Sequence, residues 1–157
     1  MSDIFEIRKD NYMITDDPKK VDIDALAALL STSYWASRRP RAVIEKSIFN
    51  SLCFSLYKGN IQIGFARIVT DYSTFAYLCD VIIEENYRGT GIGSWLINTI
   101  ITHPDIAPLR SILIITKDAH ELYRKLGFKE LKKPEQYMER LNKKGRQNES
   151  NNRSFEE

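Results

Sequence analysis

Hydrophobic residues recur along the chain with two different spacings, and the spacing predicts the type of each element. Ile23 and Leu26 begin one face of a helix that reaches Leu30, and the preceding Asp22 is a suitable N-cap. Pro40 favours the start of a second helix that continues to Asn50. The pattern thus predicts two amphipathic helices ahead of the main strands.

The middle of the chain alternates apolar and polar residues, which is the spacing of strands. A hairpin is predicted around Lys58-Gly59-Asn60, and the continuously apolar segment 76–83 predicts a strand buried on both faces. The later elements are predicted as a helix over 91–102, a strand over 112–115, a helix over 119–126 ended by Gly127, and a last strand over 137–141. A hairpin that leads into one strand–helix–strand unit indicates an α/β fold of the α+β type, with a mixed, largely antiparallel sheet flanked by helices.

Composition narrows the class of protein. The 157 residues and 18.2 kDa suit one domain, which we expect over 1–142, followed by a polar disordered tail over 143–157. A net charge of +2 gives no electrostatic reason to expect nucleic acid or a membrane as partner. The longest apolar run, Ala25–Leu30, is far too short to cross a bilayer.

The cysteines and histidines indicate neither a disulfide framework nor a metal centre. Cys53 and Cys79 lack metal-type spacing, and His103 and His120 stand apart from any Cys or carboxylate cluster. The first residues, Met1-Ser2-Asp3, do not resemble a signal peptide. We therefore expect a metal-free protein in the reducing cytoplasm.

One stretch combines a buried strand, closely spaced glycines and the start of a helix. Arg88-Gly89-Thr90-Gly91-Ile92-Gly93 follows the strand over 76–83, and no charged side chain occurs from Gly89 to Thr102. Glycine lets the backbone approach a ligand, and the free N–H groups and dipole of a helix N-terminus attract anions. The stretch predicts a phosphate or pyrophosphate site. The alternative is a tight turn whose glycines serve packing only.

Two common phosphate-binding patterns fit this stretch poorly. The P-loop pattern is absent. The dinucleotide fingerprint G-x-G-x-x-G fails at its last position, which is Ser94 or Leu96 depending on the first glycine. Only one strand–helix–strand unit is predicted, which further disfavours a dinucleotide-binding fold.

Two motifs resemble the signatures of the GNAT superfamily of N-acetyltransferases. Arg88-x-x-Gly91-x-Gly93 matches its R/Q-x-x-G-x-G/A pattern, and the segment 119–128, AHELYRKLGF, is similar to its second signature A-x-x-L-Y-x-K-x-G-F. The order and separation of the motifs also fit, and the resemblance spans about 61–141. Together the two motifs are a far more specific signal than either one alone.

The resemblance implies acetyl-CoA, or another acyl-CoA, as the donor. It implies a sheet that splays where the pantetheine arm pairs with the backbone of 81–83, and a pyrophosphate held by the N–H groups of 88–94. Thr116 stands where many members of the family carry Asn, and its hydroxyl still donates and accepts a hydrogen bond. The implied donor-binding residues are Val81, Ile82, Ile83, Arg88, Gly89, Thr90, Gly91, Ile92, Gly93, Ser94 and Thr116.

Tyr123 has two interpretations. Its spacing on the apolar face of the last helix, which an Asp118-x-x-Glu121 capping box is expected to begin, suggests a core tyrosine. The resemblance implies instead that Tyr123 points at the cofactor sulfur, where a phenol can protonate or hydrogen-bond the leaving thiolate. A backbone N–H near Ile82 would then hold the oxyanion.

The attacking amine must be neutral, so a base is expected. Asp80 is the first candidate, ahead of Glu84 and His120, and the open alternative pairs Asp80 with Arg67. Cys53 and Cys79 are interpreted as core residues, which favours direct transfer over an acyl-cysteine.

The acceptor side of the site is the least determined. Tyr34 and Trp35 follow the first helix and are candidates for the wall of an acceptor pocket, with Arg67 as a further candidate. The arginines that follow, at 38, 39 and 41, would attract a carboxylate or phosphate, unless the connection is a hydrophobic plug with a solvated basic loop.

The function expected from these features is acetyl transfer from acetyl-CoA to the primary amine of a small molecule, without a metal. The alternatives are a non-catalytic acyl-CoA-binding regulatory module and an acetyltransferase of protein amino groups. Homodimers are common among such domains, but no segment of the sequence indicates an interface.

Overall fold

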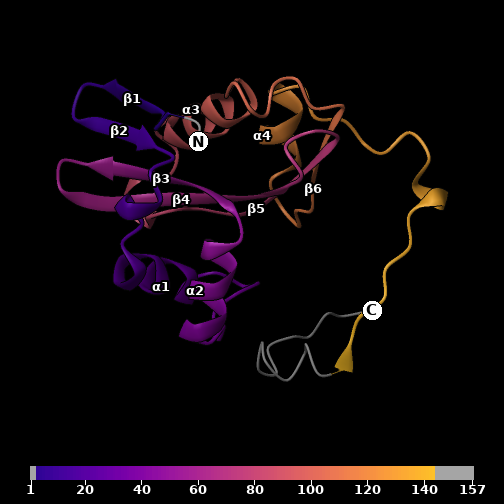
Figure 1. Ribbon diagram of the computed structural model, residues 1–157, viewed down its shortest axis with the longest axis horizontal. Helices are drawn as coiled ribbons and strands as arrows, with labels where there is room; N and C mark the ends of the chain where they lie inside the picture. The colour runs from indigo at the N-terminus through magenta and orange to yellow at the C-terminus, as the bar shows by residue number, and fades with distance from the viewer. Residues whose placement is uncertain (1–2, 144–157) are drawn as a thin grey trace.

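The computed structural model describes residues 3–143, which form one six-stranded sheet between two layers of helices (Figure 1). The strands lie in sequence order, and neighbouring strands are antiparallel except for the parallel pair β5–β6. The strands are β1 (Glu6–Lys9), β2 (Tyr12–Thr15), β3 (Leu52–Lys58), β4 (Ile61–Thr70), β5 (Phe75–Ile83) and β6 (Ser111–Ile114).

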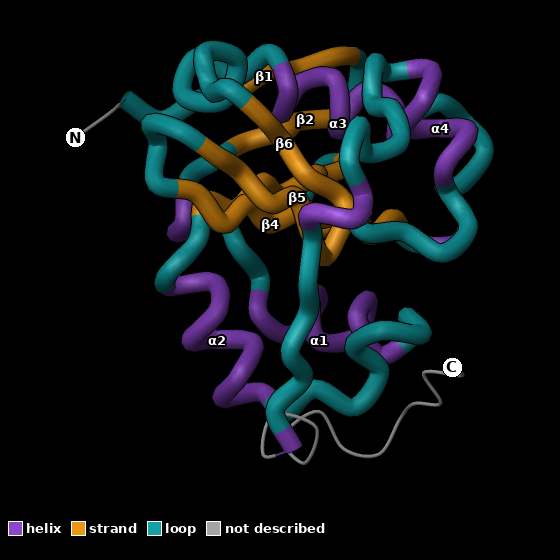
Figure 2. The backbone as a smooth tube through the Cα atoms, turned by 90° about the vertical axis from the view of Figure 1, so that its right-hand side faces the viewer, coloured by secondary structure: helices purple, strands orange, loops and turns teal. Residues whose placement is uncertain are grey.

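The helices divide between the two faces of the sheet. In Figures 1 and 2, α1 and α2 cover one face, and α3 and α4 cover the other. The helices are α1 (Ile23–Ser31), α2 (Arg41–Phe49), α3 (Ile92–Ile101) and α4 (His120–Lys125), with short 3₁₀ turns η1 (Pro18–Lys20), η2 (Glu85–Tyr87) and η3 (Pro134–Gln136). Each face therefore needs its own hydrophobic core.

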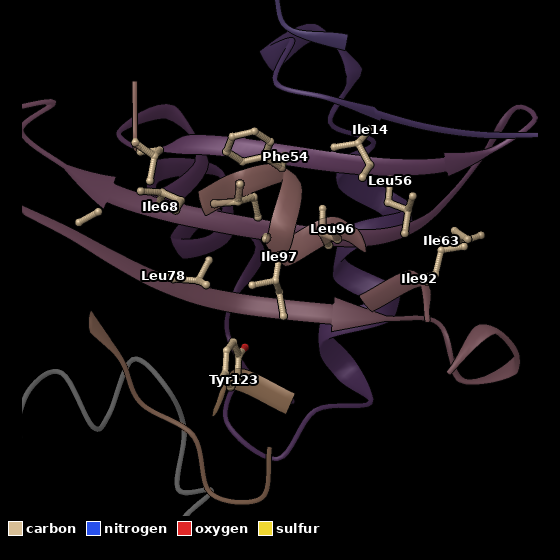
Figure 3. Close-up of a cluster of buried hydrophobic side chains, with 14 residues drawn as sticks. Ile14, Phe54, Leu56, Ile63, Ile68, Leu78, Ile92, Leu96, Ile97 and Tyr123 are labelled. Carbon is tan, nitrogen blue, oxygen red and sulfur yellow. The ribbon is translucent and has the colours of Figure 1, made fainter. Parts of the chain in front are cut away.

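Two separate clusters of buried side chains supply those cores. The cluster under α3 includes Phe54, Leu78 and Leu96, drawn in Figure 3, and the cluster under α1 and α2 includes Leu30 and Ile82. These residues are almost completely buried. Burial of apolar area on both faces holds the strands of the central sheet in a fixed register.

The predicted fold class is confirmed, and most elements agree with the prediction within one or two residues. Asp22 caps α1 by accepting the N–H of Ala25 at 3.0 Å, and Gly127 after α4 has φ of 95°. Both residues act as the local sequence predicts. Among residues 3–143, no helix is long and apolar enough to cross a membrane.

Both ends of the fold differ from the prediction: one hairpin was missed and one predicted strand is wrong. The hairpin β1–β2 was not predicted, because β1 is exposed along its whole length and so lacks an apolar pattern. The last strand predicted over 137–141 does not form, and those residues are exposed. The tail predicted over 143–157 lies, apart from Lys143, outside the described residues, so the division at residue 142 stays a prediction.

Candidate active site

A bulge in the middle of β5 sets the geometry of the site. The register with β4 shifts between Phe65 and Arg67, and Asp80 in the bulge has φ of 52°. The extra residue exchanges the two faces of the strand. Leu78 therefore packs under α3, whereas Ile82, four residues later, packs under α1 and α2.

Asp80 is buried, and side chains from the α1–α2 connection and from β4 hydrogen-bond to both of its carboxylate oxygens. Trp35 Nε1 donates to Oδ1 at 3.0 Å, and Arg39 Nη1 and Arg67 Nε donate to Oδ2 at 2.8 and 2.9 Å. Arg67 also donates to Ser51 Oγ at 3.1 Å. The sequence had suggested Arg67 as a pairing partner for Asp80 but not Arg39, which is 41 residues away in sequence.

These partners make Asp80 a poor general base. Burial by itself would raise the pKa of the carboxyl, but the charges and hydrogen bonds of Arg39 and Arg67 outweigh burial and hold the pKa below its ordinary value. The observed arrangement is the alternative in which Asp80 pairs with Arg67, and it disfavours the predicted role of Asp80 as the base. The weaker candidates are no better placed, since Glu84 caps η2 and His120 is the exposed first residue of α4.

Strands β5 and β6 separate beyond Leu78. Their pairing covers only Phe75–Leu78 against Ser111–Ile114, so among residues 3–143 no strand lies beside the end of β5 on that side. The N–H of Glu84 donates to Ile63 O in β4 at 2.7 Å, and backbone groups alternate in direction along a strand. The amides of Val81 and Ile83 therefore face the opening, whereas the amide of Ile82 faces β4.

Tyr123 lies at this opening with its hydroxyl available. It projects from α4 toward β5 (Figure 3), is 7% exposed, and packs edge-on against Phe128. Within the described part of the chain its hydroxyl has no hydrogen-bond partner. Burial, reinforced by the nearby phenol of Tyr34 and by Asp118, raises the pKa of Tyr123 to about 12. The phenol is thus a neutral hydrogen-bond donor at physiological pH.

Tyr34 lies at one side of the opening beside β5. Its hydroxyl accepts the backbone N–H of Lys117 at 3.2 Å, and Lys117 Nζ lies 5.5 Å from the centre of its ring. This contact joins the α1–α2 connection to the β6–α4 connection. Trp35 packs edge-on against Tyr34, with ring centroids 5.0 Å apart, so the two aromatic residues form one wall.

The start of α4 differs from the predicted capping box. The N-cap is Ala119, and neither Asp118 nor Glu121 makes the expected cap hydrogen bond. Instead Thr116 Oγ1 accepts the N–H of Ala119 at 3.1 Å. An Asp118 cap would shift the helix start by one residue, whereas the hydroxyl of Thr116 satisfies a free N–H just ahead of the helix. The hydroxyl hydrogen of Thr116 remains available as a donor.

The glycine loop forms the expected strand-to-helix turn. Gly89 and Gly91 have φ of 75° and 84°, and Gly91 is the N-cap of α3 without any side-chain cap. The first N–H groups of α3, from Ile92 to Ser94, have no acceptor within the helix. Arg88 Nε donates to Ile83 O at 2.9 Å, which fixes the loop against the free end of β5. Of the predicted donor-binding residues, 81–83 and 88–94 thus lie along one continuous path from β5 to α3, whereas Thr116 lies ahead of α4.

Lys9 is a residue of this region that sequence reasoning missed. A hollow of about 270 Å³ beside the loop is lined by residues of the β1–β2 hairpin and of α3: Lys9, Asp10, Tyr12, Thr90, Gly91, Ile92 and Trp95. Lys9 is exposed and carries the positive charge of this hollow, opposed by Asp10. Nothing in the sequence pointed to Lys9, because the hairpin that places it was not predicted.

The thiols near the site are poor nucleophiles. Burial raises the pKa of Cys53 to about 12 and that of Cys79 to about 11, so both are protonated at neutral pH. Among the described residues, no group of three His, Cys, Asp or Glu side chains is arranged to hold a metal ion.

Residues 49–130, half of the chain, match the family model of the acetyltransferase (GNAT) domain. This chain belongs to the GNAT acetyltransferase family. A protein of Gibberella zeae named as an acetyltransferase is 30% identical over 142 residues, covering 76% of this chain and 80% of its own. The family-model match over residues 49–130 includes both motifs and the strand between them, β6, so the resemblance noted from the motifs is confirmed.

Solved structures of GNAT proteins share the fold. A GNAT protein of Xanthomonas campestris is 36% identical, with a TM-score of 0.80 over 83% of this chain and 93% of its own. A GNAT acetyltransferase of Elizabethkingia anophelis, solved with acetyl-CoA bound, is 19% identical, with a TM-score of 0.62 over 77% of this chain and 78% of its own. The GNAT assignment makes this chain an acyltransferase.

Proposed function

We propose that this GNAT acetyltransferase moves the acetyl group of acetyl-CoA to the primary amine of a small molecule by direct attack. The observation that carries the proposal is the free end of β5, which runs into the glycine-capped start of α3 and faces the unpartnered hydroxyl of Tyr123. The bound acetyl-CoA in the Elizabethkingia anophelis relative supports the same donor here.

The donor would lie along the path from β5 to α3. The outward amides of Val81 and Ile83 suit a pantetheine arm, which carries amide groups and can pair like a short strand. The free N–H groups of Ile92 to Ser94 and the dipole of α3 suit the pyrophosphate. Lys9 adds one positive charge beside the loop.

The chemistry requires three groups around the thioester. The lone pair of the amine attacks the carbonyl carbon, and the oxyanion accepts a hydrogen bond from a backbone N–H, for which Val81 is better placed than Ile82. The C–S bond then breaks, its electron pair leaves with sulfur, and the proton lost by the amine nitrogen passes through solvent water to the departing thiolate. Tyr123 donates a hydrogen bond to the thiolate. Full proton transfer from Tyr123 is unfavourable, because its pKa of about 12 exceeds that of a thiol near 8.5.

Asp80 acts as a positioning residue. Its carboxylate holds Trp35, Arg39 and Arg67 in place on the acceptor side of the bulge. Two guanidinium groups around one carboxylate leave an excess of positive charge, which disfavours a protonated amine in this region. We infer that the acceptor enters as the free base and needs no side chain to deprotonate it.

A small acceptor fits the closed side of the site better than a folded protein does. The contact between Tyr34 and Lys117 ties two connections together across the acceptor side, and Trp35 narrows the same region. Arg67 contributes to this wall through Asp80 rather than by a free guanidinium group. We also propose a cytoplasmic location, which the free thiols Cys53 and Cys79 support.

The test is thiol release from acetyl-CoA by the purified protein, measured against a panel of small primary amines and against lysine-containing peptides. The proposal predicts acceleration by at least one small amine, with kcat/KM rising with pH until that amine is deprotonated. Acceleration by peptides alone would make the protein an acetyltransferase of protein amino groups. Tight acetyl-CoA binding without turnover on any amine would make it a regulatory module.

A further inference from the structure

The buried cluster around Asp80 holds one more positive charge than negative charge. Arg39 and Arg67 both pair with its carboxylate, at 2.8 and 2.9 Å, and their side chains are only 10% and 15% exposed. Among residues 3–143, neither guanidinium group forms an ion pair with a second carboxylate. A buried charge without a counterion is costly, so the cluster favours a further anion at this place.

Arg39 has the donors that such an anion needs. Its Nη1 is occupied by Asp80, whereas Nε and Nη2 have no hydrogen-bond partner within the described part of the chain. These two groups form one edge of the planar guanidinium, where their N–H bonds point the same way and suit the two oxygens of a carboxylate. The fold therefore leaves a two-donor binding edge unused.

Solvent reaches this edge of Arg39. Within residues 3–143, the one buried side-chain nitrogen or oxygen atom without a hydrogen-bond partner is Ser55 Oγ. The unused N–H groups of Arg39 are thus not sealed inside the protein, although most of the side chain is covered. A small ligand can contact them without any rearrangement of the core.

Tyr77 supplies a further donor on the same face of the sheet, the face that α1 and α2 cover (Figures 1 and 2). Cys53, Arg67 and Cys79 lie opposite one another on β3, β4 and β5, and Cys53 packs under α1 and α2. Side chains two residues apart in a strand share a face, so Tyr77 lies on the same face as Cys79. Burial raises the pKa of Tyr77, and the charges of Arg67 and Arg39 oppose that rise. Its hydroxyl has no hydrogen-bond partner among the described residues.

We propose that the acceptor amine carries a carboxylate, which binds to the Nε and Nη2 edge of Arg39 and to the hydroxyl of Tyr77. Asp80, the partner of Arg39, directly precedes Val81, whose N–H is proposed for the oxyanion. The anion site therefore adjoins the reacting thioester, and only a short spacer joins the carboxylate to the attacking amine. The substrate class is thus small amino acids. This inference deepens the proposed acetyl transfer, and its catalytic consequence rests on that function.

The first measurement compares amino acids with their amides as acceptors in the thiol-release assay. The panel holds the common α-amino acids, β-alanine and γ-aminobutyrate, each beside its own amide. The amide has nearly the same shape, lacks the negative charge and has the less basic amine, so the supply of free base alone favours the amide. The proposal predicts a kcat/KM at least about tenfold higher for an acid than for its amide.

Two outcomes of this comparison overturn the carboxylate site while leaving acetyl transfer in place. One is turnover of amides, or of uncharged amines, that equals or exceeds turnover of every acid. The other is a preference for 2-aminoethyl phosphate over every amino acid, which would assign the edge of Arg39 to a phosphate.

Arg39→Lys tests the guanidinium edge itself. Lysine keeps a positive charge for Asp80 but replaces the two-donor edge with a point charge. The ratio of kcat/KM for the acid to kcat/KM for its amide should fall at least about tenfold. Arg41→Lys is the matched control and should keep the wild-type ratio, because Arg41 is exposed and forms its ion pairs with carboxylates of α1 and α2.

Tyr77→Phe keeps the proposal testable if Arg39→Lys does not fold. It removes only a hydroxyl that bonds to no described residue, and it should lower the same ratio. A folded Arg39→Lys variant with the wild-type ratio overturns the proposal. If that variant does not fold, an unchanged ratio in Tyr77→Phe does so.

Calorimetry separates this inference from acetyl transfer. Acids and amides of the panel are titrated into the full chain with and without CoA, where no acetyl group is present and binding alone is measured. If no amine is acetylated, the proposed transfer fails and this binding decides the inference. Tighter binding of an acid than of its amide supports the carboxylate site, and equal binding or none under both conditions overturns it.

Discussion

Trp35 donates its indole N–H to Asp80 at 3.0 Å, although 45 residues separate them in sequence. The bond ties the connection between α1 and α2 to the bulge in β5. Both the acceptor wall and the outward amides of β5 therefore depend on the same carboxylate. A change at Asp80 is expected to alter the stability of the fold and the geometry of the site together.

Asp80→Asn should lower the free energy of unfolding and make that free energy less dependent on pH in the acid range. The variant leaves Arg39 and Arg67 buried without a carboxylate, and breaking a buried ion pair costs about 3–5 kcal/mol of the free energy of unfolding. The pKa of Asp80 is lowered in the folded state. The contribution of Asp80 to the free energy of unfolding is therefore fully present above its pKa in the unfolded chain, about 4. That contribution is lost as the pH falls through the lower pKa of the folded state.

Urea unfolding between pH 2 and pH 7 measures this dependence, with Asp24→Asn as the control. Asp24 pairs with Arg41 on the surface, where solvent screening leaves such a pair little effect on stability. The difference in unfolding free energy between the wild type and Asp80→Asn should shrink toward acid pH. The prediction fails if this difference is constant with pH, or if it is no larger than the difference between the wild type and Asp24→Asn. Either result would show that the ionised carboxylate of Asp80 does not stabilise the fold.

Tyr123→Phe should lower kcat about 10²-fold and leave acetyl-CoA affinity within about threefold of wild type. The hydroxyl contacts only the leaving sulfur in the proposed mechanism, so its loss affects the transition state more than the bound donor. Thiol-release assays measure kcat, and equilibrium titration measures the affinity for acetyl-CoA. An unchanged kcat in a folded variant would remove Tyr123 from the chemistry.

The pH profile of the wild type gives a second test of Tyr123. Because burial raises its pKa to about 12, the phenol stays protonated, and kcat should not fall up to about pH 10. An ordinary tyrosine would begin to lose its proton there. A descending limb centred below pH 10 that disappears in Tyr123→Phe would contradict the raised pKa.

Gly91→Asp should weaken acetyl-CoA binding at least about tenfold more than Gly91→Asn. Asn and Asp have the same shape and both tolerate positive φ, and a Cβ at Gly91 meets no atom within 4 Å. The two variants therefore differ mainly in a negative charge beside the proposed pyrophosphate. Calorimetry with acetyl-CoA measures both. Equal affinities would place the anion away from the start of α3.

Lys9→Gln and Asp10→Asn should shift acetyl-CoA affinity in opposite directions, each by a few-fold at low salt. The two side chains share the hollow beside Gly91 and carry opposite charges. The effects should fade at high ionic strength, because both groups are exposed and screened. The acetyl-CoA affinities of the wild type and both variants, measured at low and at high salt, test this prediction. Changes in the same direction, or changes insensitive to salt, would exclude the hollow from donor binding.

The sequence predicted the parts of the site that local chemistry determines. The glycine turn, the Asp22 cap and the αL residue Gly127 depend on neighbouring residues only, and each was predicted correctly. The long-range contacts were not predictable in the same way. The Asp80 cluster joins residues 35, 39, 67 and 80, and no spacing rule indicates that a bulge in β5 would bring Arg39 to the carboxylate.

The missed ends of the sheet have a physical explanation. A strand such as β1, exposed along its length, carries no hydrophobic alternation, and its existence depends on hydrogen bonds to β2. The segment 137–141 has the residue types of a strand, but a strand needs a neighbour to pair with. Its expected neighbour, β6, is in place, but residues 137–141 do not pair with it.

Titration calorimetry with acetyl-CoA, with ATP and NADH as controls, tests the central claim most directly. The free end of β5 and the start of α3 should bind acetyl-CoA with micromolar affinity, while ATP and NADH, which lack a pantetheine arm, should bind far more weakly. Folded protein that takes up no acetyl-CoA, or that binds ATP and NADH equally well, would contradict the account.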